Sequence, residues 1–100
     1  MSIEKMSVQQ IEAHLKDLSG WELKGDKLHR ELKLKNFVQA WGFMTQVAIF
    51  AEKVDHHPEW SNVYSRVTID LTTHEASGIS QRDFDLAKKI NEILADMGIS

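Results

Sequence analysis

The sequence has 100 residues, of which 42% are hydrophobic and 27% charged, and it contains no cysteine. This balance predicts a single globular domain, residues 1–100, and the absence of thiols excludes disulfides and favours a cytoplasmic location. The net charge is -3, and no cluster of basic residues suggests direct contact with nucleic acid. No stretch approaches the roughly 20 apolar residues of a membrane span, so we expect no membrane partner.

The first predicted element is a helix that begins after Ser7 and ends at Gly20. Ser7 and Gln10 have the spacing of a capping box, in which two side chains bond free backbone N–H groups. Apolar residues then recur every three or four positions, at Val8, Ile11, Leu15 and Leu18. Residues 21–34 are predicted to form two short strands, because apolar residues flank a lysine-glycine-aspartate turn.

A long helix is predicted next, over residues 36–55. Asn36 and Gln39 have the spacing of a helix start. Two apolar stripes follow, one made by Phe37, Trp41, Met44, Ala48 and Ala51, the other by Phe43, Val47, Phe50 and Val54. Because so broad an apolar surface must be covered on more than one side, we expect this helix to lie at the centre of the core.

The second half of the chain predicts two more strands and a closing helix. Residues 60–73 alternate apolar and polar side chains, and a reversal near Tyr64 divides them into two strands. Ser80 and Asp83 again have capping-box spacing. The apolar positions of the last helix are Phe84, Ala87, Ile90, Leu94 and Met97.

The resulting order is α-β-β-α-β-β-α. Hairpin strands between helices predict an α+β fold, a four-stranded antiparallel sheet with three helices packed on one face. Such a sheet has exposed strand edges, and pairing them across a symmetric dimer is one known way to protect them. We therefore expect a homo-oligomer, either a homodimer or a homotetramer.

The stretch EKVDHHPEW places two adjacent histidines before the only proline of the chain. Glu52 precedes His56 by four residues, so a helix reaching His56 would put both side chains on one face. Pro58 would end that helix, and it disfavours helical backbone at His57, so the second imidazole should leave the helix axis. His74 lies between the last strand and the last helix, a place where binding residues are common.

These residues admit three interpretations. In a purely structural one, the histidines mark a helix end, Asp83 is a cap and Trp60 is a core aromatic. A metal site has suitable ligand types, but there is no pair of histidines four residues apart, and adjacent histidines are poorly placed to hold one ion. General acid and base chemistry fits better, because an imidazole titrates near pH 6.5 and can accept or donate a proton.

Residues of this region resemble the signature of the pterin-4a-carbinolamine dehydratase family. The resemblance is carried by Glu52, His56, His57, Pro58, Trp60, Asn62, Val63, Tyr64, Thr73, His74, Glu75 and Asp83. The length and the order of helices and strands are also similar, so the resemblance covers nearly the whole chain.

The resemblance implies a hydro-lyase that removes water from 4a-hydroxytetrahydropterin to give quinonoid dihydropterin. That substrate is left by aromatic amino acid hydroxylases, so the reaction belongs to tetrahydropterin recycling and needs no metal or organic cofactor. His56, His57 and His74 would surround the pterin, with His57 and His74 as acid and base. The remaining implied site residues, which would orient a histidine or contact the substrate, are Glu52, Pro58, Trp60, Thr73 and Asp83.

The same family is similar to a dimerisation cofactor of a homeodomain transcription factor. This implies a second hypothesis, a non-catalytic interaction module that uses the apolar surface of the predicted helix over residues 36–55. Such a module would tolerate loss of the histidines but would be sensitive to a charge at Phe43 or Phe50. An enzyme would instead lose turnover with His57→Ala or His74→Ala while staying folded and assembled.

Overall fold

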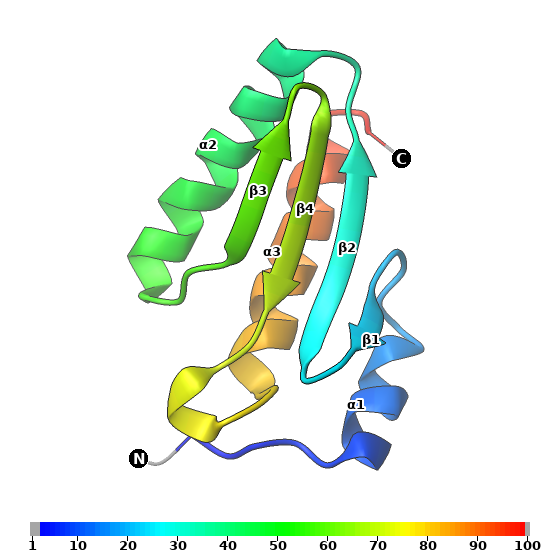
Figure 1. Ribbon diagram of the computed structural model, residues 1–100, viewed down its shortest axis with the longest axis vertical. Coiled ribbons are helices and arrows are strands. Elements are labelled where there is room, and N and C mark those ends of the chain that lie inside the picture. Colours follow the sequence, from blue (N-terminus) through cyan, green and yellow to red (C-terminus); the bar gives the residue numbers. More distant parts are fainter. Residues whose placement is uncertain (1–2, 100) are drawn as a thin grey trace.

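The computed structural model describes residues 3–99 and confirms the predicted order of elements (Figure 1). The α-helices are α1 (Val8–Leu15), α2 (Phe37–Val54) and α3 (Gln81–Asp96). The strands are β1 (Glu22–Lys24), β2 (Lys27–Lys33), β3 (Glu59–Val63) and β4 (Arg66–Leu71), and a short 3-10 helix, η1 (His74–Ala76), follows β4. Between residues 3 and 99 no helix is both long enough and apolar enough to cross a bilayer.

The four strands form one antiparallel sheet in the order β1-β2-β4-β3, and α2 and α3 cover one of its faces (Figure 1). Large, fully buried apolar side chains come from both layers and include Leu28, Val67, Ile69, Leu71, Phe43, Val47, Phe84 and Ile90. Each contributes about 1.5–3 kcal/mol by leaving water. The predicted α+β class is confirmed, and the core lies between the sheet and the two long helices.

A row of polar residues lines the opposite, open face of the sheet. Glu22 pairs with His29 across β1 and β2, His29 with Asp70 across β2 and β4, and Asp70 with Glu59 across β4 and β3. Residues directly opposite each other point to the same face. His29 is nearly buried there, with Nδ1 2.7 Å from Asp70 Oδ1 and Nε2 3.1 Å from Glu31 Oε2. These two carboxylates, Asp70 first, raise the pKa of His29.

The helix starts follow the sequence prediction more closely than the helix ends do. Both predicted capping boxes form, at Ser7 and at Ser80. Helix α1 ends at Leu15 instead of Gly20, so the predicted end is wrong by more than a turn. Leu18, after the helix end, is buried in the core, and Gly20 takes a left-handed φ of 88° in the following turn.

Helix α2 ends before the histidine pair, and Pro58 is not what ends it. Asp55 adopts a left-handed conformation with φ 54°, and the N–H of His56 donates back to the carbonyl of Ala51 at 3.0 Å. This local cap ends the helix at Val54. The prediction that the proline ends the helix is therefore wrong, and both histidines lie on the segment that connects α2 to β3.

Candidate active site

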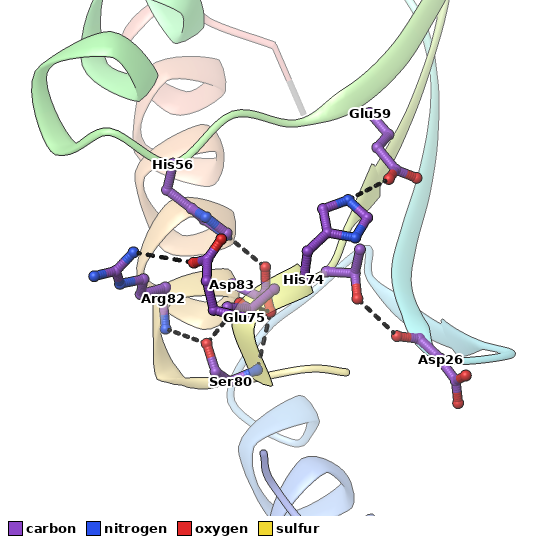
Figure 2. A network of polar contacts seen from close by, with 10 residues as sticks. Asp26, His56, Glu59, His74, Glu75, Ser80, Arg82 and Asp83 are labelled. Atoms are coloured by element: carbon purple, nitrogen blue, oxygen red, sulfur yellow. Dashed lines mark hydrogen bonds and ion pairs between the residues drawn. The ribbon is translucent and has the colours of Figure 1, made fainter. Parts of the chain in front are cut away.

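His56 is held in a buried hydrogen-bond network at the start of α3 (Figure 2). Its Nε2 lies 2.6 Å from Oδ1 of Asp83, a side chain with no exposed surface. The other oxygen, Oδ2, accepts from the Thr73 hydroxyl at 2.8 Å and from the Ser80 backbone N–H at 2.9 Å. Because a carboxylate only accepts hydrogen bonds, His56 presents a protonated Nε2 to Asp83.

The same network builds the first turn of α3. Asp83 is the third residue of the helix and bonds the N–H of its cap residue, Ser80. The Ser80 hydroxyl lies 2.7 Å from Thr73 Oγ1 and accepts from the backbone N–H of Arg82. The polar side chains buried here therefore have partners, which is the condition for burying them at low cost. Asp83 is both a helix cap and the partner of His56.

His57 has a different carboxylate partner from His56, namely Glu52. Its Nε2 lies 2.8 Å from Glu52 Oε1, and its side chain is 55% exposed. The expectation that Glu52 shares a helical face with His56 is wrong, because the left-handed Asp55 turns the chain before His56. Glu52 instead reaches the next histidine, which supplies that imidazole with a carboxylate partner.

His74 comes from the far side of the site, on η1, and lies next to Glu59 at the start of β3 (Figure 2). The His74 Nε2 atom is 3.2 Å from Glu59 Oε2. The other oxygen of Glu59 accepts a hydrogen bond from the ammonium of Lys27, the first residue of β2. This hydrogen bond is the main reason that the pKa of Glu59 is lowered.

The three histidines border one open cavity of about 480 Å³. Its lining residues are Asp55, His56, His57, Pro58, Glu59, Thr72, His74, Glu75 and Arg82. Each imidazole has a carboxylate neighbour, so the cavity presents groups that can exchange protons with a bound molecule. Within residues 3–99, no three histidine, aspartate or glutamate side chains are grouped in a way that could hold a metal ion.

The sequence-predicted site residues fall in three places. His56, His57, Pro58 and His74 line the cavity. Thr73 and Asp83 are completely buried and do not line the cavity; Thr73 bonds Asp83, and Asp83 bonds His56. Glu52 and Trp60 line a neighbouring apolar groove of about 950 Å³ between α2 and β3, and only Glu52 is joined to the cavity, through its bond to His57.

The sequence analysis missed two residues that line the cavity, Glu59 and Arg82, and one residue that contacts Glu59, Lys27. Glu59 stands within the stretch EKVDHHPEW, so its position beside the histidines was a usable signal. Arg82 lies two residues after the cap of α3, and its Nη1 atom is 3.8 Å from Oε2 of Glu75. Lys27 has no local signal, because only the registers of β2 against β4 and of β4 against β3 bring it to Glu59.

Comparison with known proteins identifies the family. Residues 4–93 match the family model described as pterin 4 alpha carbinolamine dehydratase. A protein of Solibacter usitatus, provisionally named a pterin-4-alpha-carbinolamine dehydratase, is 50% identical over 91% of this chain and 96% of its own. A Prochlorococcus marinus protein with the same provisional name is 48% identical over 91% of this chain and 95% of its own.

A solved structure has the same fold. It is described as a transcriptional coactivator/pterin dehydratase from Brucella melitensis, and it superposes with a TM-score of 0.87 at 40% identity, covering 90% of this chain and 98% of that one. The chain therefore belongs to the pterin 4 alpha carbinolamine dehydratase family, and the resemblance read from the sequence is confirmed.

Proposed function

We propose that this chain catalyses the dehydration of 4a-hydroxytetrahydropterin to quinonoid dihydropterin and water. The observation that carries the proposal is one cavity bordered by three imidazoles, each with its own carboxylate. The pairs are His56 with Asp83, His57 with Glu52, and His74 with Glu59. Membership of the family and the names of the relatives supply the substrate class.

The reaction needs one proton donor and one proton acceptor. The bond between C4a and the hydroxyl oxygen breaks as a proton reaches that oxygen, and the N5 proton leaves while its electron pair forms the N5=C4a double bond. His57 and His74 are the proposed acid and base, because their side chains are 55% and 80% exposed at the cavity. The chemistry proposed for this site uses no metal or organic cofactor.

The other predicted residues have supporting roles in this proposal. Asp83 and Thr73 act through His56, which they hold against the cavity wall. Glu52 orients His57 by accepting from its ring. Pro58 lines the cavity beside the histidine pair and contacts the bound pterin. Trp60 faces the adjacent groove, so its contact with substrate would have to be made from that side.

Stopped-flow absorbance of freshly generated 4a-hydroxytetrahydropterin tests the proposal. We expect chelator-treated wild-type protein to accelerate dehydration, and His57→Ala or His74→Ala to lose a factor of about 10²–10⁴, the usual contribution of a general acid or base. His14→Ala is the matched control, since His14 lies on α1 against Phe84, outside the cavity. A folded wild-type protein that gives no acceleration would overturn the proposal.

The proposed substrate places the chain after an aromatic amino acid hydroxylase. That class of enzyme generates the 4a-hydroxylated pterin, and dehydration is the step that allows the ring to be reduced again for another cycle. This functional link, and a cytoplasmic setting for it, are part of the proposal. Adding the purified protein to a pterin-dependent hydroxylase assay should prevent accumulation of the 4a-hydroxypterin absorbance.

We also propose that the protein self-associates through α2 and the β3 edge. Val38 and Ile49 are 77% and 67% exposed and, with Trp41, form an apolar stripe on α2. Strand β3 is an edge of the sheet, and Val63 at its end is also exposed. Exposed apolar stripes and open strand edges favour association. Phe43, in contrast, is fully buried and belongs to the core.

The same stripe supports a second candidate function, an interaction module for another protein. The neighbour from Brucella melitensis carries the description transcriptional coactivator as well as pterin dehydratase. Ile49→Asp should abolish assembly in sedimentation velocity and leave the histidines unaltered. Gln46→Asp, at another exposed position of α2, should leave assembly intact. A wild-type protein that sediments as a monomer at all concentrations would contradict self-association.

A further inference from the structure

The β1–β2 hairpin reaches the cavity from the open side of the sheet. Lys27, which follows the hairpin turn, bonds Glu59 through its ammonium group. Beside it, the Thr72 hydroxyl donates to the carbonyl oxygen of Asp26 in the turn, at 3.4 Å (Figure 2). Thr72 and Glu59 both line the cavity. The hairpin therefore supports the cavity wall that carries Glu59.

Glu59 connects this hairpin to one of the three histidines. One carboxylate oxygen, Oε1, accepts from Lys27, and the other, Oε2, lies 3.2 Å from Nε2 of His74. His74 sits on a three-residue helix and its side chain is 80% exposed, so its own element restrains the ring only weakly. Glu59, in contrast, is placed by the pairing of β3 with β4. Glu59 on the strand can thus hold the ring of the exposed His74.

Lys27 also sets the charge of Glu59. Its hydrogen bond and its positive charge lower the pKa of Glu59 and outweigh the opposing effect of burial. Besides Lys27 on β2, Glu59 is near His74 of η1 and opposite Asp70 of β4. The remaining titratable groups around the cavity are Asp55, His56, His57, Glu75 and Arg82. Lys27 makes the largest contribution to the lowered pKa of Glu59, and His74 makes a smaller one in the same direction.

We propose that Glu59 and Lys27 are positioning residues for His74. The Glu59 carboxylate accepts a hydrogen bond from the Nε2–H of His74, so that Nδ1 is the ring nitrogen that exchanges a proton with the substrate, and Lys27 holds Glu59 in place. The role in turnover rests on the proposed dehydratase function. The contact itself does not, because it can be observed in the resting protein.

The ring tautomer of His74 is the first test, and it needs no substrate. In ¹⁵N NMR spectra of the neutral imidazole, wild type should show Nε2 protonated as the single form. Glu59→Ala should give a mixture of both tautomers, Lys27→Met an intermediate spectrum, and Lys27→Arg the wild-type spectrum. Lys33→Met is the matched control, an exposed lysine at the other end of β2. Identical His74 spectra in all variants would overturn the inference.

The pH profile of turnover is the second test. Glu59 has a lowered pKa, so its ionised form is present above that pKa and is lost as the pH falls through it. Without Lys27 this loss occurs at higher pH. Lys27→Met should therefore move the acidic limb of kcat to higher pH. It should also lower kcat at neutral pH, because Lys27 no longer holds Glu59 in place, by less than the roughly 10²–10⁴ expected for loss of an imidazole. KM should change little.

The two tests separate the two proposals. Altered tautomers in Glu59→Ala, together with a wild-type protein that does not accelerate dehydration, would support the positioning contact and reject the dehydratase function. An active wild type whose kcat profile is the same in Lys27→Met and Lys33→Met would reject the positioning role alone. Recovery of the profile in Lys27→Arg would show that the positive charge at this position is what matters.

Discussion

Replacing Asp83 with asparagine should destabilise the whole domain through one buried contact. The Asp83 side chain has no exposed surface and bonds His56, Thr73 and the Ser80 N–H. Asparagine has nearly the same shape, and its carbonyl oxygen can still accept from Thr73 and Ser80. Its amide group, however, then faces the protonated Nε2 of His56, so a donor meets a donor.

The expected cost follows from that lost contact. A hydrogen bond to a charged group contributes about 1.5–3 kcal/mol, and leaving a buried donor without a partner is costly. We therefore expect Asp83→Asn to lower the free energy of unfolding by about 2 kcal/mol. For a domain of this size such a loss lowers Tm by roughly 10 °C. It is a large part of the 5–15 kcal/mol typical of a folded domain.

Urea denaturation followed by circular dichroism is the assay, with Asp85→Asn as the control. Asp85 lies two residues further along α3 and accepts a hydrogen bond from Gln81 at the surface. The substitution Asp85→Asn removes the same negative charge as Asp83→Asn. Its replacement should change the free energy of unfolding by less than about 0.5 kcal/mol. Both proteins must be compared at equal concentration, because the proposed self-association would add to stability. Equal stabilities of the two variants would refute the argument for the buried network.

Two further predictions concern other parts of the fold. The pKa of His29 is raised, chiefly by Asp70, so its stabilising contribution is complete below its ordinary pKa of about 6.5 and is lost as the pH rises through the higher folded value. The stability advantage of wild type over His29→Gln in urea should shrink with rising pH; a constant difference would contradict this. Gly20→Ala should destabilise by about 1 kcal/mol or more, because φ is 88° and a Cβ would lie 2.5 Å from Arg30 Cζ. Gly42 lies in the middle of α2, and a Cβ added there would meet no atom within 4 Å, so Gly42→Ala should stabilise by about 0.5–1 kcal/mol. If urea denaturation showed Gly20→Ala to be more stable than Gly42→Ala, the comparison would be refuted.

The parts of the fold that follow from local patterns were predictable from the sequence. Ser80 and Asp83 have capping-box spacing, and both bonds of the box form. The alternation of residues 60–73 likewise predicted a hairpin with a reversal near Tyr64, and the structure places β3 and β4 on either side of it. Such features depend on residues a few positions apart, so the sequence contains the information directly.

The pairing of the site residues was less predictable, because it depends on backbone geometry and strand register. The left-handed Asp55 decides that Glu52 meets His57 instead of His56, and nothing in the spacing indicates that conformation. The contact of Lys27 with Glu59 joins residues 32 positions apart on strands that are not neighbours in the sheet. No periodicity within either segment reports it.

The shared role of Asp83 limits how independently the site can move. When the first turn of α3 frays, the bond from Ser80 N to Asp83 breaks, and the carboxylate that holds His56 is released at the same time. The free energy of this local opening is therefore an upper limit on the free energy needed to release the His56 imidazole from Asp83. Hydrogen exchange at the Ser80 amide measures that free energy, so one backbone proton can report the rigidity of His56.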